Sequence, residues 1–117
     1  MSYVGIDVAK AHLDSCVLGT AIQRFANDPD GRHALIAWLR SHAPQLIVLE
    51  PSGGYERALV LTLSEAELPV AVVNARQVRD FAKALGQRAK TDRLDAQVLA
   101  RYAQAVQPQA RPLLNAQ

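Results

Sequence analysis

An α/β fold with a mixed five-stranded sheet is predicted by two features of the sequence. Near the N-terminus, three short segments with strand character follow one another closely: residues 3–8, 13–18 and 21–26. Such a succession predicts an antiparallel meander. Further along, residues 46–49 and 70–73 are continuous apolar runs, as expected of strands that are covered on both faces. Because helical patterns separate and follow these runs, we expect helices packed on the sheet.

The first strand carries the first candidate site residue. Val4, Ile6 and Val8 alternate onto one face of this strand, and Asp7 lies on the other face. Taken alone, Asp7 has two interpretations, because it could face solvent from a half-exposed strand or serve as a ligand. Asp14, in the second strand, is interpreted as a surface residue.

The helical patterns have recognisable ends. Asp28 precedes Pro29 at the start of the first helix, and we interpret Asp28 and Asp30 as capping residues. Asn74 caps a later helix, which Gly86 ends. The apolar face of that later helix is formed by four residues: Val78, Phe81, Ala82 and Leu85.

Glu50 is the second candidate site residue. It directly follows the apolar run of residues 46–49, and in open sheets ligands gather at the carboxyl ends of the strands. The alternative is a plain strand end. Gly53 and Gly54 could cradle a phosphate on backbone amides, but they match no phosphate-loop motif, so we interpret them mainly as a turn. Glu56 follows in the first turn of the next helix, where an acid is favourable.

The predicted order of elements is β-β-β-α-β-α-β-α-α, which is the order of an RNase H-like fold. In such a sheet the first and fourth strands are neighbours. We therefore expect Asp7 and Glu50 to lie close together.

Asp92 and Asp95 form an acidic pair on the last helical pattern, which we expect to run from about Asp92 to about Val106. At 100° per residue, six apolar residues share one side: Leu94, Val98, Leu99, Tyr102, Ala105 and Val106. The other side carries Arg93, Gln97, Ala100, Arg101 and Gln104. Asp95 falls in the middle of the apolar side and Asp92 at its edge, close enough to share a cation. A capping box at the helix start explains the same pair, so both interpretations are open.

Charge is unevenly spread along the chain. The formal net charge is +2, but residues 1–69 carry 5 Lys and Arg against 8 Asp and Glu, whereas residues 70–117 carry 8 against 3. Basic residues crowd around the acidic pair: Arg76, Arg79, Lys83, Arg88, Lys90 and Arg93. This arrangement suits a site that holds a polyanion near a metal, although an ordinary solvated helix face explains each residue taken singly.

Composition excludes several classes of protein. The 117 residues are half hydrophobic and suffice for one domain, and no apolar run approaches the about 20 residues of a membrane span. The N-terminus lacks a signal-peptide pattern, so we expect a soluble cytoplasmic protein. The single cysteine, Cys16, excludes a disulfide framework and is expected to be buried. His12, His33 and His42 lack metal-ligand spacing, and no nucleophile motif of a hydrolase is present.

The sequence therefore indicates four carboxylates as candidate site residues: Asp7, Glu50, Asp92 and Asp95. If they converge, they repel one another unless cations neutralise them, and hard divalent cations such as Mg²⁺ or Mn²⁺ prefer oxygen ligands. A pair of such ions stabilises the attacking and leaving oxygens of a phosphodiester. Basic residues at the rim would hold the nucleic-acid backbone: Arg88, Lys90 and Arg93. These features predict phosphoryl transfer on DNA.

Four segments resemble the N-terminal domain of DEDD-type insertion-sequence transposases, the insertion-sequence-110 family. They are VGIDVAK at residues 4–10, LEPSGGYE at 49–56, VNARQVRDFAK at 73–83 and AKTDRLDA at 89–96. The resemblance covers residues 3–112 and implies a RuvC-like form of the RNase H fold. It also implies that Asp7, Glu50, Asp92 and Asp95 form the metal-binding tetrad.

The resemblance implies further partners. Members of the family use a serine nucleophile on a separate C-terminal domain and a structured guide RNA from the element, and we expect a homo-oligomer in the full-length protein. We expect residues 1–107 to form the catalytic domain and residues 108–117 to be a tail or linker toward a C-terminal domain. The setting would be the bacterial or archaeal cytoplasm, without a membrane partner.

Two other functions are compatible with the same residues. One is a stand-alone RNase H-like nuclease, such as a Holliday-junction resolvase, with water as the nucleophile. The other is a non-catalytic module for nucleic-acid binding or dimerisation that keeps the fold as a scaffold. Cleavage of branched DNA by the chain alone would favour the first, and nucleic-acid binding without metal dependence would favour the second.

Overall fold

The structure is a computed structural model that describes residues 2–86 and 95–110. It contains the predicted elements in the predicted order. The strands are β1 (Ser2–Val8), β2 (His12–Val17), β3 (Gln23–Ala26), β4 (Pro44–Leu49) and β5 (Val70–Val72). The helices are α1 (Pro29–His42), α2 (Arg57–Glu65), α3 (Ala75–Ala84) and α4 (Ala96–Val106).

The strands form one mixed sheet in the order β3-β2-β1-β4-β5. The meander of β1, β2 and β3 is antiparallel, whereas β4 pairs with β1 and β5 pairs with β4 in parallel. The prediction of an α/β, RNase H-like sheet with β1 and β4 as neighbours is therefore confirmed.

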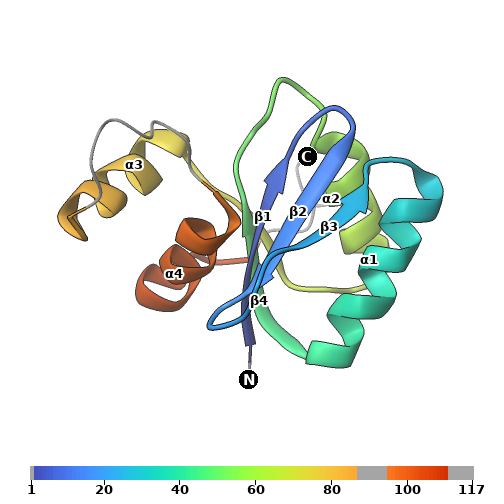
Figure 1. Cartoon of the computed structure of the whole chain (residues 1–117), viewed down its shortest axis with the longest axis horizontal. Coiled ribbons are helices and arrows are strands. Elements are labelled where there is room, and N and C mark those ends of the chain that lie inside the picture. Colours follow the sequence, from blue (N-terminus) through green and yellow to red (C-terminus); the bar gives the residue numbers. More distant parts are fainter. Residues whose placement is uncertain (1, 87–94, 111–117) are drawn as a thin grey trace.

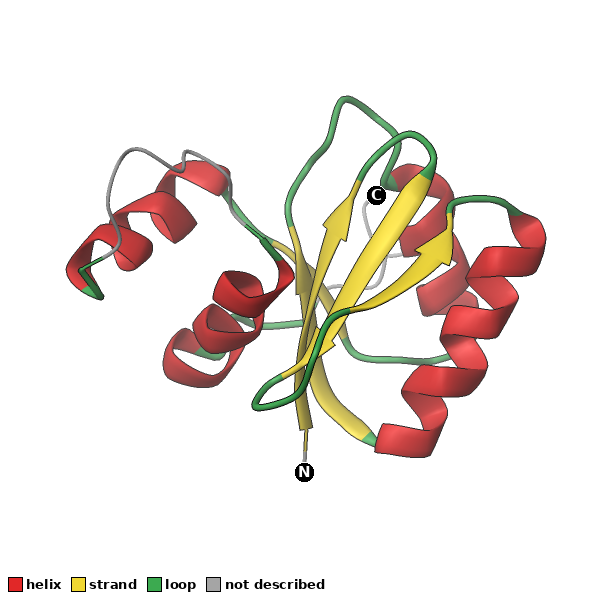
Figure 2. Ribbon diagram, viewed as in Figure 1, coloured by secondary structure: helices red, strands yellow, loops and turns green. Residues whose placement is uncertain are grey.

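Helices cover both faces of the sheet (Figure 1). Val4, Ile6 and Val8 on β1 pack against α1 and α2 in one buried cluster. On the opposite face a second cluster joins the sheet to α3 and α4, and it includes Leu46, Val48 and residues of both helices. The turn after β1 and the loop after β4 lie at the same end of the sheet (Figure 2).

The helix starts follow from local capping. The Asp28 side chain accepts a hydrogen bond from the Gly31 amide at 2.7 Å, and the Asn74 side chain accepts one from the Arg76 amide at 2.8 Å. The interpretation of Asp28 and Asn74 as caps is confirmed, whereas Asp30 lies in the first turn of α1 and is not its N-cap. None of the described helices is long and apolar enough to cross a lipid bilayer.

Helix α4 lies against β1 at Gly5, which is fully enclosed. A Cβ atom at this position would overlap the carbonyl oxygen of Ala96 and the amide nitrogen of Ala100, and would lie 2.6 Å from the Leu99 Cβ. Backbone therefore meets backbone at this crossing. The absence of a side chain at Gly5 and the small side chains of the two alanines allow this approach.

The predicted limits and faces of two helices are corrected by the structure. Helix α4 begins at Ala96, because Asp95 has extended backbone geometry (φ −86°, ψ 175°) and is the N-cap, so Asp95 does not lie within the apolar side of the helix. Ala100, predicted on the polar side, is fully buried because it faces Gly5, whereas Val106 is 49% exposed. Leu85, predicted on the apolar face of α3, is the C-cap of that helix and is 47% exposed.

The segment after α4 stays close to the domain as far as it is described. Pro108 and Ala110 line a shallow depression together with Tyr3 and Leu46, and Ala110 packs against the cluster under α4. Ala110 thus extends the buried cluster that joins the sheet to α3 and α4.

The crossing at Gly5 predicts a large effect of a single methyl group. We expect Gly5→Ala to lower the free energy of unfolding by at least about 2 kcal/mol, because the atoms that the methyl group meets are backbone atoms that cannot rotate away. Urea denaturation of both proteins measures this difference. Gln45→Ala, at an exposed position of β4, is the control and should change stability by no more than about 0.5 kcal/mol. Equal stability of Gly5→Ala and the parent chain would contradict the close approach.

Candidate active site at the ends of β1 and β4

Asp7 and Glu50 are brought side by side by the parallel pairing of β1 and β4. Ile6 pairs with Leu49, so the residues that follow them, Asp7 and Glu50, are neighbours across the two strands. Asp7 points to the same face as Gly5, two residues earlier, and Glu50 to the same face as Val48. Both carboxylates therefore lie on the face that α4 covers.

Glu50 lies in an environment that disfavours its charge. The side chain is half-buried, and its Oε2 atom is buried without a hydrogen-bond partner among the described residues. Burial raises the pKa of Glu50, the positive charge of Arg79 on α3 lowers it, and the negative charge of Asp7 raises it further. Burial dominates, so the net direction is upward. A buried carboxylate oxygen without a partner is the arrangement that a cation would relieve.

Asp95 lies at the start of α4, on the same face of the sheet. Its Oδ1 atom accepts a hydrogen bond from the Val98 amide at 3.0 Å, so it caps the helix. The next residue, Ala96, lies over Gly5, whose β2 partner is Cys16. Burial raises the pKa of the Cys16 thiol, and the negative charge of Asp95 adds to this effect, which places the Asp95 carboxylate near Cys16. One capping bond leaves Asp95 with further acceptor capacity.

The structure thus places three of the four predicted carboxylates on one face, with Asp7 and Glu50 adjacent. Asp92 lies outside the described residues, as do Arg88, Lys90 and Arg93. Within residues 2–86 and 95–110, no three His, Cys, Asp or Glu side chains are grouped closely enough to hold a metal ion. The assignment of the tetrad stays a prediction.

Sequence reasoning interpreted Asp14 as a surface residue and did not place it beside Asp7. It is the β2 partner of Asp7, and directly paired residues point to the same face of a sheet, so Asp14 belongs to the same surface as Asp7. Asp14 forms an ion pair with Arg24, its own partner on β3. The register of the β1–β2 hairpin was the signal that could have found Asp14, because a short turn places residues 7 and 14 opposite each other.

The loop after β4 is held by two further residues that sequence reasoning did not assign to the site. Glu56 Oε1 accepts hydrogen bonds from the amides of Ser52 and Gly54 at 2.9 and 3.0 Å. Those amides are thus satisfied by a carboxylate of the chain itself, which supports the interpretation as a turn. Asn27 Nδ2 donates to the carbonyl of Ala9 at 2.9 Å and to that of Tyr55 at 3.3 Å, so it ties the turn after β1 to the loop after β4.

A groove of about 510 Å³ runs between α4 and the end of β2. It is lined by Cys16, Leu18, Gly19, Thr20, Gln97, Val98 and Arg101. The groove starts beside the acidic surface, because Cys16 is the strand partner of Gly5 and lies near Asp95. Arg101 is exposed and supplies the charge of the groove lining.

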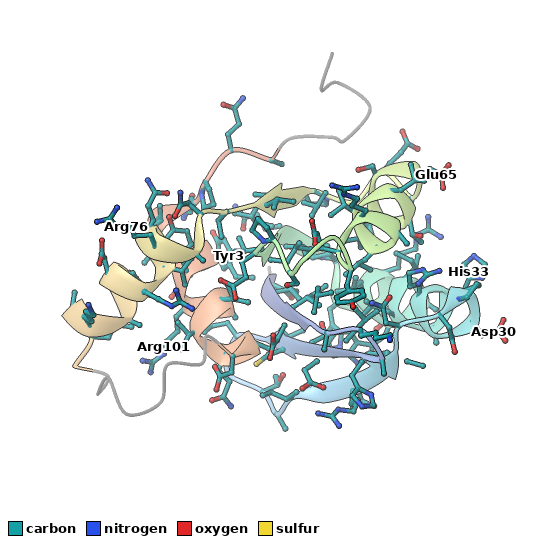
Figure 3. The ribbon with its side chains drawn as sticks, turned by 90° about the horizontal axis from the view of Figure 1, so that it is seen from above. Tyr3, Asp30, His33, Glu65, Arg76 and Arg101 are labelled. Atoms are coloured by element: carbon teal, nitrogen blue, oxygen red, sulfur yellow. The ribbon has the colours of Figure 1, made fainter. Side chains whose placement is uncertain are left out.

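Four charged residues are labelled on opposite sides of the molecule in Figure 3. Arg76 and Arg101 lie on the side of α3 and α4, which also covers the acidic surface of the sheet. Asp30 and Glu65 lie on the opposite side, on α1 and α2.

Fold and site together define a class of protein: an RNase H-like domain with acidic residues at the carboxyl ends of two adjacent parallel strands. Residues 4–117 match the model of a transposase family, the DEDD type of insertion sequence 110. The chain belongs to this transposase family.

The chain is also similar to individual proteins of known name and structure. The chain is 32% identical over 108 residues to the pilin gene-inverting proteins of Moraxella bovis and Moraxella lacunata. These alignments cover 86% of the chain and 34% of each relative, so the chain spans about a third of the length of the curated relatives it matches. The structure of Thermus thermophilus RuvC matches with a TM-score of 0.55 and 20% identity, over 99% of this chain and 88% of that one, which identifies a shared fold.

The pKa shifts of Glu50 and Glu56 have opposite signs and predict opposite effects on stability. Folded Glu50 keeps its proton to a higher pH than an ordinary glutamate, whose pKa is 4.5. The folded state therefore binds more protons than the unfolded state just above pH 4.5, and stability falls as the pH rises from 4.5 through the raised pKa of Glu50. Hydrogen bonds from the Ser52 amide lower the pKa of Glu56, so its stabilisation is present above 4.5 and is lost as pH falls through its folded pKa. Without divalent cations at pH 7, we expect Glu50→Gln to raise the Tm and Glu56→Gln to lower it.

Thermal unfolding followed by circular dichroism between pH 4 and 8 in EDTA checks both signs. The Glu50→Gln difference should shrink as the pH falls toward 4.5, and the Glu56→Gln difference should begin to shrink only below 4.5, as the pH approaches the lowered pKa of folded Glu56. A Glu50→Gln variant with a lower Tm than the parent chain at pH 7 would show that the charge of Glu50 is stabilised in the metal-free fold.

Proposed function

We propose that this chain is the metal-binding catalytic part of a DNA transposase or recombinase. In this proposal Asp7, Glu50, Asp92 and Asp95 hold Mg²⁺ or Mn²⁺, and residues 1–107 form the catalytic domain. The observation that carries the proposal is the buried, unpartnered Oε2 atom of Glu50 beside Asp7. Membership of a transposase family supports the reaction class.

The residues on the acidic surface fit a hard divalent cation. They offer carboxylate oxygens, which Mg²⁺ and Mn²⁺ prefer, rather than thiolates or imidazoles. When bound, such an ion would stabilise charge on the phosphate group that reacts. The chain's own part is to hold the ligands in place: β1 and β4 fix Asp7 and Glu50, and the N-cap geometry fixes Asp95.

Nucleic acid would approach from the side of α3 and α4. Arg88, Lys90 and Arg93 are the proposed backbone contacts, and two described residues extend this basic surface. Arg79 acts on Glu50 through its charge, and Arg101 lines the groove that leads away from the acidic surface. Along the helix axis, Arg101 is about 9 Å from Asp95, or roughly two to three nucleotides of a stacked strand.

Rearrangement of DNA is the activity that the relatives suggest. The matched Moraxella proteins are named for inversion of a pilin gene, and this chain covers about a third of each. We infer that the acidic site cooperates with partners beyond the described residues: a serine-bearing C-terminal domain, a structured guide RNA and further copies of the protein. Because DNA is the proposed substrate, the proposed setting is the bacterial or archaeal cytoplasm.

Metal binding is the first test of the proposed function. We expect the chain to bind Mn²⁺ in calorimetry, and an Asp7→Asn/Asp95→Asn double variant to bind it at least about tenfold more weakly, because two ligand charges are lost. Asp30→Asn, an exposed change on α1, is the matched control and should bind like the parent chain. Equal binding by the double variant and the parent chain would remove the metal site.

Arg101 provides a test of the nucleic-acid surface. We expect Arg101→Ala to weaken binding of single-stranded DNA in EDTA and to reduce the slope of log K against log salt by about 1, because one phosphate contact is lost. Fluorescence anisotropy over a salt series measures both quantities. Arg40→Ala, on the side of α1, is the control. Equal slopes for the Arg101→Ala variant and the parent chain would show that DNA does not follow the groove.

A further inference from the structure

A row of charged residues crosses the sheet beside the acidic site. Arg24 on β3 pairs with Asp14 on β2, and Asp14 pairs with Asp7 on β1. Residues that are directly opposite in antiparallel strands point to the same face, so the three side chains form a line that continues to Glu50. Three carboxylates thus follow one another across adjacent strands, with one guanidinium at the edge.

The guanidinium and the nearest carboxylate form a two-point ion pair. Arg24 Nε donates to Asp14 Oδ1 at 2.8 Å, and Arg24 Nη2 donates to Asp14 Oδ2 at 3.1 Å. The Asp14 side chain is 15% exposed and that of Arg24 is 58% exposed. The carboxylate is therefore the sheltered partner, and it fixes the position of a long side chain that would otherwise move freely in solvent.

This pair lies close to Asp7. The hydrogen bond and charge of Asp14 raise the pKa of Arg24, and the charge of Asp7 adds to them, so Arg24 lies within the electrostatic reach of Asp7. An arginine next to Asp7 would compete with a divalent cation for the same negative charge. Arg24 instead forms its ion pair with Asp14, on the strand next to that of Asp7.

We propose that Asp14 is a positioning residue that holds Arg24 away from Asp7 and thereby keeps the charge of Asp7 for a divalent cation. This inference rests on the proposed function, because it assumes that Asp7 is a metal ligand. In this role Asp14 would act through Arg24, which donates hydrogen bonds to both of its carboxylate oxygens.

A double-mutant cycle tests the inference, with Mn²⁺ affinity measured by calorimetry on the 117-residue chain. We expect Asp14→Asn to weaken Mn²⁺ binding about tenfold, because the released Arg24 then neutralises Asp7. Arg24→Gln should bind Mn²⁺ at least as tightly as the parent chain, because it removes the competing charge. The double variant should bind within about threefold of the parent chain, because neither charge is left.

The outcomes separate the possible roles of Asp14. If Asp14→Asn and the double variant are equally weak, Asp14 is itself a ligand and the inference is overturned. If Asp14→Asn binds Mn²⁺ like the parent chain, Arg24 does not compete and the inference is also overturned. Mn²⁺ binding by the parent chain tests the proposed function separately. If the parent chain does not bind Mn²⁺, both the proposed function and this inference are overturned.

Folding is controlled by circular dichroism of each variant. If the Asp14→Asn variant does not fold, the Arg24→Gln variant alone tests the inference. Mn²⁺ binding by Arg24→Gln several-fold weaker than that of the parent chain would show that Arg24 supports the site instead of competing with it. Arg40→Gln, which removes a positive charge on the side of α1, should leave the affinity for Mn²⁺ unchanged.

Discussion

The contact between α4 and β1 at Gly5 is the constraint on which the site depends. Because Gly5 has no side chain, the first turn of α4 lies directly on the strand, and Asp95 is held at the start of that turn. Asp7 is two residues further along the same face of β1. A larger residue at position 5 would lift the helix and carry Asp95 away from Asp7, so packing and site geometry are set by the same atoms.

The acidic surface is organised by strand register as much as by the helix. Parallel pairing of β1 with β4 sets Glu50 beside Asp7, and antiparallel pairing of β1 with β2 sets Asp14 on its other side. Like charges on adjacent strands are unfavourable, so each needs compensation. Asp14 receives it from Arg24, whereas a buried oxygen of Glu50 has no partner among the described residues.

The fold could be predicted from the sequence, because alternation in the first strand and the apolar runs at residues 46–49 and 70–73 each permit few arrangements. The face occupied by Asp7 followed from the same alternation and is confirmed. The start of α4 was predicted wrongly, because Asp95 suits both the interior of a helical pattern and an N-cap, and only tertiary packing decides between them. The ion pair of Asp14 with Arg24 depends on strand register, which single-residue patterns do not contain.

The charge of Arg79 offsets only part of the cost of burying the charge of Glu50. A guanidinium in direct contact with Glu50 would stabilise the fold, but it would also occupy the positions that an exchangeable cation needs. Instead, Arg24 is bound to Asp14 one strand away from Asp7, and Arg79 acts on Glu50 through its charge from α3. Under the proposed function, the fold would give up stability at Glu50 and gain a site that a divalent cation could enter and leave, a compromise expected where function opposes stability.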